Sequence, residues 1–233
     1  MSDDSYDLSP TPRRVLTDDV VDAIRDAILS GKIRPGARLI EEDLAASLKV
    51  SRGPVRQAIF RLQQEGLVVH EPHRGATVGE VSQDDVEDIY SLRLALERLA
   101  IEQASRKAGA KELAEIEAVL ERFRATPRAD VSRRLVADLD IEFHDAIFRA
   151  SGNRRLYRTW ETLRSQLMMF LMLRDALPDD YLDSWHRDHM LLLDVIRGGD
   201  TAIAQETIET HINRAKDRLL ASLHASGRVS SPS

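Results

Sequence analysis

The sequence predicts a mainly α-helical protein with two domains. Apolar residues make up 42% of the 233 residues, enough for a sizeable core, whereas aromatic residues make up only 5%. Apolar side chains recur at helical spacing along most of the chain, and only the stretch LVVHEPHRGATV is β-prone. The net charge of −6 is unevenly spread, with a mildly basic front and an acidic back. This division suggests two domains with different partners.

The first domain is expected over residues 13–79, after a disordered tail at residues 1–12. Its first helix begins at Thr17, a candidate cap, and ends at Gly31. A second short helix fits Glu41–Leu48, and a third follows Ser51 as its cap. Two short strands around a turn that contains proline and glycine come next. Three helices followed by a hairpin predict a winged helix-turn-helix.

The second domain is expected over residues 82–225, with a flexible tail at 226–233. Ser82 and Asp85 resemble a capping box at its start. Turn residues such as Gly109, Pro127 and Gly152 then divide a nearly continuous helical pattern. The pattern predicts an all-α bundle of six helices. They are expected at roughly 83–108, 110–125, 130–150, 153–175, 179–198 and 200–225.

Composition excludes several classes of protein. The chain has no cysteine, so a disulfide framework, a thiolate nucleophile and a cysteine zinc site are impossible. Any metal must therefore be held by histidines and carboxylates. No apolar run approaches the roughly 20 residues that span a bilayer, and the acidic N-terminus does not resemble a signal peptide. We therefore expect a cytoplasmic protein that has no membrane partner.

The predicted reading helix carries the first functional signal, in VSRGPVRQAIFRL. Its N-terminal end should enter the major groove of DNA, where arginine recognises guanine and serine can hold a phosphate. We expect Arg52 and Arg56 to read bases, with Ser51 on the backbone. Arg38 precedes the second helix, and Arg74 and Gly75 form the tip of the wing. A single arginine here would usually be a solvated surface residue, but this ordered set predicts a DNA-binding surface.

The second signal is an acid and a histidine on one helix face. Asp140 and His144 are four residues apart among apolar side chains, so their spacing allows a salt bridge, a catalytic dyad or two metal ligands. His189 and His211 also lie on apolar helix faces, whereas His186 is a weaker rival of His189. One buried histidine is common in a core. Three of them with one aspartate favour a shared divalent cation, zinc or nickel among the candidates.

The front of the chain resembles the winged-helix domain of the GntR superfamily of bacterial transcription regulators. The resemblance runs through IRPGARLIEEDLAASLKVSRGPVRQAIFRLQQEGLV and HRGATV, about 60 residues in unbroken order. It implies a homodimer on a palindromic operator in double-stranded DNA. The implied DNA contacts are Arg38, Ser51, Arg52, Arg56, Arg74 and Gly75. Gln57 and Glu42 depart from the residues that many members carry, so the operator sequence does not transfer.

Residues 83–225 resemble the FCD ligand-binding domain of the FadR subfamily. The matching pieces are RLALE, DIEFHDAIFRASGN and HMLLLDVIRGGDTAIAQETIETHI. The resemblance implies metal ligands at Asp140, His144, His189 and His211, and the expected helix count favours the six-helix, vanillate-type branch. It also implies a small carboxylate effector beside the metal. Arg93 is a candidate effector contact or half of an Arg–Glu pair with Glu97, and Asn153 is a candidate contact or a helix cap.

The sequence therefore predicts a metabolite-responsive DNA-binding regulator, most often a repressor in this family, and not an enzyme. A metal-dependent hydrolase using the aspartate and three histidines is the rival class. Against the hydrolase, the sequence offers no obvious further inward carboxylate as a general base, since Glu142 is turned about 200° from Asp140 on its helix. A purely structural metal site is the third possibility.

Overall fold

The fold was analysed in a computed structural model that describes residues 13–71, 74–173 and 179–227. The tail expected at residues 1–12 and residues 228–233 of the tail expected at 226–233 lie outside these ranges. The described chain divides into two compact units, with the boundary between Gly79 and Glu80. Each unit is described by itself below.

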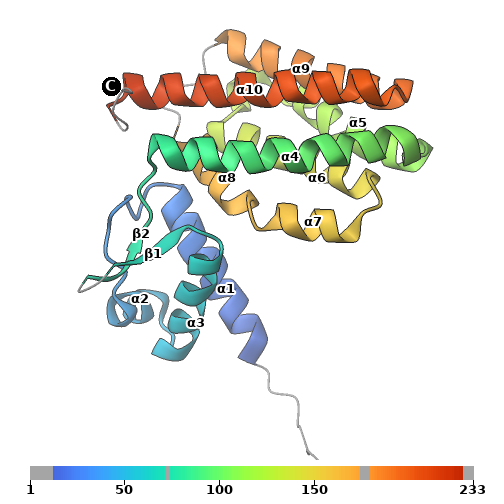
Figure 1. Ribbon diagram of the computed structural model, residues 1–233. Coiled ribbons are helices and arrows are strands. Elements are labelled where there is room, and N and C mark those ends of the chain that lie inside the picture. The colour runs from blue at the N-terminus through green and yellow to red at the C-terminus, as the bar shows by residue number, and fades with distance from the viewer. Residues whose placement is uncertain (1–12, 72–73, 174–178, 228–233) are drawn as a thin grey trace, which may run out of the picture. The chain divides into compact units, whose positions relative to one another are not determined.

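The first unit contains three helices and a two-stranded antiparallel sheet (Figure 1). The elements are α1 (Arg13–Leu29), α2 (Glu41–Leu48), α3 (Arg52–Gln64), β1 (Val68–Glu71) and β2 (Gly75–Val78). Helix α1 packs against α3, and the buried side chains of Ile24, Val55 and Leu62 form the centre of the core. The strands pair in the register Val68 with Val78. This is the expected winged helix-turn-helix.

Two local expectations in this unit need correction. Helix α1 begins at Arg13 rather than at Thr17, and the Thr17 hydroxyl donates to Gln57 Oε1 on α3 at 3.2 Å instead of capping the helix. No glycine or proline separates Arg13 from Thr17, so nothing stops the helix from extending. Ser51 does occupy the N-cap position of α3, but within the described residues its side chain accepts no capping hydrogen bond.

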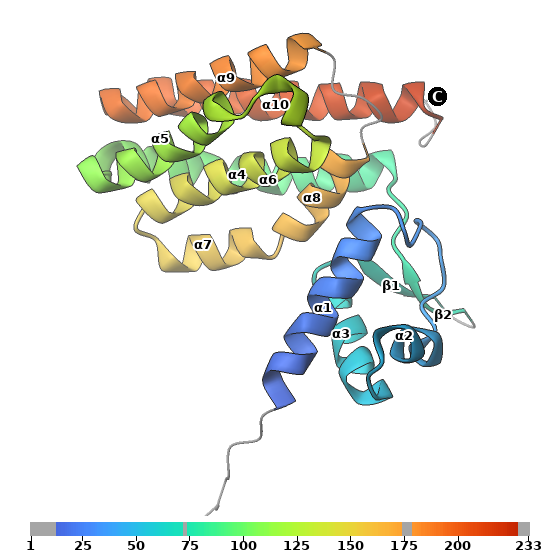
Figure 2. The ribbon, with the colours of Figure 1, turned by 180° about the vertical axis from the view of Figure 1, so that it is seen from behind.

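The second unit is an all-α bundle (Figures 1 and 2). Helix α4 packs lengthwise against α10 and also contacts α6, while α5 lies against α6 and α9. The Ser82–Asp85 capping box is present at the start of α4. The helices are α4 (Gln83–Lys107), α5 (Ala110–Ala125), the short 3₁₀ helix η1 (Arg128–Asp130), α6 (Arg133–Ala150), α7 (Arg154–Glu161), α8 (Arg164–Met172), α9 (Asp179–Gly198) and α10 (Thr201–Ala225).

The helix expected over residues 153–175 is two helices, α7 and α8, as far as the described residues reach; residues 174 and 175 lie outside them. At the junction the hydrogen bonds tighten, because Thr162 N donates to Thr159 O and Leu163 N to Trp160 O, each three residues back. The sequence does not predict this break, since neither glycine nor proline occurs there. The described part of this domain therefore has seven α-helices instead of six, and the helix count no longer favours the vanillate-type branch.

Candidate metal centre and DNA-binding surface

Three histidines from three helices meet inside the bundle. His144 lies on α6, His189 on α9 and His211 on α10, and one ring nitrogen of each lies within 4.8 Å of the others. His144 and His189 are fully buried, and His211 is partly exposed. Helical spacing accounts for their inward orientation, because each stands on the apolar stripe that its helix turns inward. The bundle thus brings together the three histidines that the sequence singled out.

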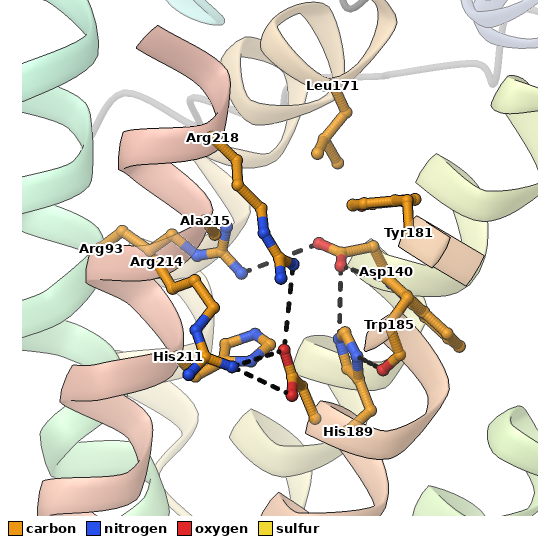
Figure 3. Close-up of a pocket in the computed structure, with 11 residues that line it drawn as sticks. Arg93, Asp140, Leu171, Tyr181, Trp185, His189, His211, Arg214, Ala215 and Arg218 are labelled. Atoms are coloured by element: carbon orange, nitrogen blue, oxygen red, sulfur yellow. Dashed lines mark hydrogen bonds and ion pairs between the residues drawn. The ribbon is translucent and has the colours of Figure 1, made fainter. Parts of the chain in front are cut away.

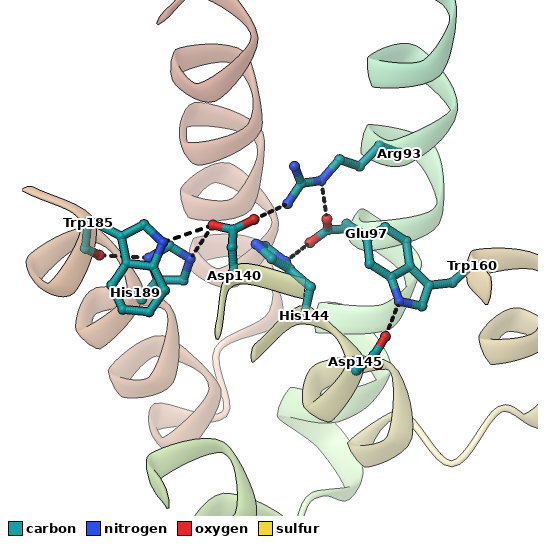
Figure 4. Close-up of polar contacts among 8 residues, drawn as sticks. All are labelled: Arg93, Glu97, Asp140, His144, Asp145, Trp160, Trp185 and His189. Carbon is teal, nitrogen blue, oxygen red and sulfur yellow. Dashed lines mark hydrogen bonds and ion pairs between the residues drawn. The ribbon is translucent and has the colours of Figure 1, made fainter. Parts of the chain in front are cut away.

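Hydrogen bonds fix the Nδ1 ring nitrogens of His144 and His189 (Figure 4). His144 Nδ1 contacts Glu97 Oε2 at 2.6 Å, and His189 Nδ1 contacts the Trp185 carbonyl oxygen at 2.6 Å. Both partners can only accept, provided that Glu97 is ionised, so each Nδ1 carries the proton and each Nε2 of a neutral ring carries a lone pair. Among the described residues, neither Nε2 has a hydrogen-bond partner, although both are buried.

Asp140 borders the histidine cluster from one turn earlier on α6. Its Oδ1 lies 3.3 Å from His189 Nε2 and accepts a hydrogen bond from Trp185 Nε1 at 2.9 Å. Its Oδ2 lies 3.8 Å from Arg93 Nη2. Among the described residues, two buried Nε2 atoms without hydrogen-bond partners, a third imidazole and an adjacent carboxylate form a donor set that fits a borderline divalent cation.

Electrostatics keep this donor set ready to bind a cation. Burial by itself would raise the pKa of Asp140, but His189, His144 and Arg93 together hold that pKa well below its usual value. Burial lowers the pKa of His144, and it lowers the pKa of His211 further with help from the neighbouring His189. The carboxylate is therefore ionised and these imidazoles are neutral at pH 7, which are the forms that bind metal.

His186 does not belong to the cluster. Its ring stacks on Phe123 of α5, with centroids 5.7 Å apart and an interplanar angle of 14°. The histidine three residues later, His189, is the one that meets His144 and His211. The structure thus decides between two histidines that helical periodicity separated only weakly.

Arg93 and Glu97 form the buried pair that the sequence left open. Arg93 Nε donates to Glu97 Oε1 at 2.6 Å, and both side chains are 1% exposed. Burial opposes ionisation of Glu97, yet His144 and Arg93 lower its pKa below the usual value. Glu97 therefore contacts both His144, a candidate metal ligand, and the Arg93 guanidinium. Sequence reasoning missed this double role. Its place on the buried face of α4, one turn after Arg93, was the available signal.

Asn153 is a helix cap. Its side-chain oxygen accepts from Leu156 N at 3.1 Å at the start of α7, and Asn153 is not among the residues that line the pocket beside the histidines. Of the two candidate effector contacts, the structure brings only Arg93 to that pocket.

The pocket opens beside the histidine cluster between α9 and α10 (Figure 3). Its open space is about 20 Å³, room for roughly one water molecule. Besides the expected residues, Asp188, Arg214 and Arg218 line it, and none of these three was singled out from the sequence. Asp188 and the buried Glu97 also correct the argument that no further carboxylate faces this region. The full lining is Arg93, Asp140, Leu171, Tyr181, Trp185, Asp188, His189, His211, Arg214, Ala215 and Arg218.

The candidate DNA contacts lie at the start of α3 and around the wing, and all their charged members are exposed. Arg52 pairs with Glu42 at 2.7 Å, and Arg56 pairs with Glu41 at 3.0 Å. Ion pairs this exposed to solvent stabilise only weakly, so phosphates or bases can displace the acids easily.

Arg38 lies beside the wing, because its backbone bridges to Thr77 of β2. Arg74 is exposed and pairs with Glu71 at 3.0 Å. Gly75 has φ +79°, and a Cβ there would meet no neighbouring atom within 4 Å. Glycine is therefore required by the backbone conformation of this turn and leaves its surface open to a partner.

In the described part of the chain, no helix is long and apolar enough to span a membrane.

The two units together define a DNA-binding transcription regulator, in which one chain carries a winged helix-turn-helix and an all-α domain. The chain belongs to the GntR family of bacterial regulatory proteins, in the group that carries an FCD domain. Residues 16–78 match "Bacterial regulatory proteins, gntR family" and residues 88–214 match "FCD domain". Both families are those of regulators rather than enzymes, which removes the hydrolase alternative.

Individual proteins give the same result. The chain is 28% identical to the "Probable D-xylose utilization operon transcriptional repressor" of Paenarthrobacter nicotinovorans, over 95% of this chain and 97% of that one. It is 26% identical to the uncharacterized regulator YdhC of Bacillus subtilis (strain 168), over 84% of this chain and 87% of that one. The solved structure of McbR/YncC from E. coli superposes with a TM-score of 0.74 at 26% identity, covering 88% and 97% of the two chains.

Proposed function

We propose that this chain is a metabolite-responsive repressor whose all-α domain holds a divalent metal ion and a small carboxylate effector. The observation that carries the proposal is the meeting of three imidazoles, in which the buried Nε2 atoms of His144 and His189 have no hydrogen-bond partner within the described part of the chain. Such atoms are costly to bury unless something binds them. Their position in a domain fused to a DNA-binding unit gives the metal a regulatory purpose.

The proposed ligands are Asp140, His144, His189 and His211. Three nitrogens and one oxygen suit zinc best, with nickel as a possible substitute. When bound, the ion would supply a Lewis-acid centre with coordination positions left for an acid. Glu97 and the Trp185 carbonyl hold two of the imidazoles in the orientation and tautomer that binding needs.

Arg93 is the proposed protein contact for the effector carboxylate. Its Nη2 is buried and, among the described residues, has no hydrogen-bond partner, while the residue lines the pocket beside the cluster. A guanidinium in this position can pair with a carboxylate that also reaches the metal. The pocket has too little open space for an organic acid as it stands, so binding requires side chains to move. That movement is the physical basis for two states with different effector affinity.

The DNA-binding side of the proposal uses Arg52 and Arg56 on bases in the major groove and Ser51 on a phosphate, with Arg38, Arg74 and Gly75 on the DNA backbone and in the minor groove. A homodimer would present two such surfaces to a palindromic operator. Helix α4 supports dimerisation, because Leu92 and Leu99 are 52% and 41% exposed and lie two turns apart on one face. Repression follows the printed role of the Paenarthrobacter relative, and the target DNA places the protein in the cytoplasm.

The test uses a duplex that the full-length protein itself selects from a random DNA pool. Fluorescence anisotropy follows its release by a panel of small carboxylates, with zinc and then with a chelator. Zinc-loaded wild type should release the DNA with at least one acid, and both chelation and His144→Ala should abolish that response. His186→Ala is the matched control and should respond like the wild type. Equal release with and without metal would overturn the metal-dependent switch, and metal binding without any effector response would indicate a structural metal.

A further inference from the structure

Three guanidinium groups converge on the pocket, and the proposed effector contact accounts for only one. Arg93 enters from α4, whereas Arg214 and Arg218 both come from α10 (Figure 3). Arg93 is compensated within the bundle, since Glu97 and Asp140 both lie within ion-pair distance of it. The two arginines of α10 are therefore a separate feature that the proposed function does not yet use.

The carboxylate of Asp188 on α9 lies against both α10 arginines. Arg214 Nη1 donates to both oxygens of Asp188 at 3.2 Å, and Arg218 Nη1 lies 3.9 Å from Oδ2. The Asp188 side chain is only 16% exposed, while those of Arg214 and Arg218 are 49% and 38% exposed. The carboxylate thus lies deeper than its partners, and the arginines extend from the pocket towards solvent.

The spacing along α10 aligns these arginines with the metal ligand on the same helix. Arg214 follows His211 by three residues and Arg218 follows it by seven, so all three stand on one face of the helix. At about 1.5 Å rise per residue, the two guanidinium-bearing positions lie about 4.5 and 10.5 Å along the axis from His211. A short, flexible acid anchored at the histidine cluster could therefore extend a second acidic group to this pair.

We propose that Arg214 and Arg218 form a second anion subsite, and that Asp188 occupies it until an effector with two carboxylates displaces it. This inference rests on the proposed function and adds to it the class of effector, a small dicarboxylate. One carboxylate lies at the metal and Arg93, and the other takes the place of Asp188 on Arg214 and Arg218. Since the present space holds about one water molecule, departure of the Asp188 carboxylate also supplies room that the ligand needs.

Asp188 gives the subsite its selectivity. A monocarboxylate that binds at the metal has no second charge to offer, so the α10 arginines keep their pair with Asp188. With a dicarboxylate, the α10 arginines exchange the Asp188 carboxylate for the second carboxylate of the ligand. The dicarboxylate thereby forms charge-assisted hydrogen bonds that a monocarboxylate cannot form. The same exchange breaks a contact between α9 and α10, and therefore links recognition of the second acid to the packing of two bundle helices.

The experiment is calorimetric titration of the zinc-loaded, full-length protein with chain-matched pairs of acids. The dicarboxylates malonate, succinate, glutarate and adipate are compared with propanoate, butyrate, pentanoate and hexanoate. At least one dicarboxylate should bind about tenfold or more tightly than its monocarboxylate partner. Arg214→Gln should remove that advantage and leave the monocarboxylate and zinc affinities within about twofold of the wild type.

Asp188→Asn should have the opposite effect on dicarboxylate binding, because it removes the negative charge that competes for both arginines. We expect it to strengthen dicarboxylate binding by roughly threefold to tenfold, with little change for monocarboxylates. Arg197→Gln is the control, since this residue of α9 pairs with Glu117 and Asp194 and does not line the pocket. Retained zinc affinity shows that each variant is folded.

The outcomes separate the inference from the proposed function. If monocarboxylates bind as tightly as dicarboxylates, or if Arg214→Gln weakens both equally, the second subsite is refuted and a carboxylate at the metal still stands. If Asp188→Asn weakens dicarboxylate binding while zinc binding is intact, Asp188 is not the displaced group and the inference fails. If no acid of either series binds the zinc-loaded wild type, the proposed effector class itself fails together with the inference.

Discussion

Replacing Glu97 by glutamine tests how the interior of the bundle supports the metal centre. Glu97 accepts from Arg93 Nε and His144 Nδ1, each at 2.6 Å, and both partners are fully buried. A glutamine oxygen can still accept one of these bonds, but its amide group can only donate. One buried donor is therefore left unpaired, and Arg93 loses its closest compensating charge.

Both the loss of folding stability and the loss of zinc affinity have an expected magnitude. Removing one partner of a buried, hydrogen-bonded ion pair costs about 3–5 kcal/mol, and for a domain of this size 3 kcal/mol corresponds to roughly 6–12 °C in Tm. Loss of a group that orients a histidine ligand typically weakens metal binding about 10–100-fold. We therefore expect Glu97→Gln to lower the Tm of the metal-free protein by roughly 10 °C and its zinc affinity by at least about tenfold.

The assays are thermal unfolding with chelator present and zinc titration well below the Tm of the variant. Glu121→Gln is the matched control, because Glu121 pairs with Arg124 on the surface of α5 and is 52% exposed. This control should change neither quantity measurably. If Glu97→Gln binds zinc and unfolds like the wild type, then Glu97 neither orients His144 nor compensates Arg93, and the reasoning is wrong.

Three other predictions concern DNA, pH and assembly. Arg52→Ala should weaken binding to the selected operator by about 1–3 kcal/mol without changing the Tm, and unchanged affinity in a gel-shift titration would remove Arg52 from base reading. Burial lowers the pKa of His211, so the unfolded chain binds a proton that the folded chain does not. Unfolding of the metal-free protein should therefore become easier as the pH falls below about 6.5, less so in His211→Gln, and an identical pH slope in denaturant titrations would contradict this. Leu92→Glu should convert a dimer to a monomer in light scattering, and an unaltered mass would exclude this face of α4 from the interface.

Much of the site was accessible from the sequence because its ligands lie on regular helices. Asp140 and His144 share a face by spacing alone, and His189 and His211 stand on apolar stripes that any bundle must bury. Proximity between these helices did not follow from spacing, and the family resemblance supplied it. The structure then brought the three histidines within 4.8 Å of one another.

What escaped prediction depends on tertiary packing. Glu97 reads locally as the partner of Arg93, but its bond to His144 joins residues 47 positions apart on α4 and α6. The contact between Asp188 and Arg214 likewise exists only because α9 and α10 lie side by side. No glycine or proline occurs at the break between α7 and α8, so the sequence does not predict the break. No glycine or proline lies between Arg13 and Thr17 either, so the helix can begin before Thr17.

The central claim is that Asp140 and the three histidines hold one divalent metal ion. Titration calorimetry of chelator-treated, full-length protein with zinc tests it most directly. The account predicts one zinc ion bound per chain in the wild type and in His186→Ala, and loss of that binding by at least about 100-fold in His189→Ala. A wild type that binds no zinc or nickel, or a His189→Ala variant that binds as the wild type does, would contradict it.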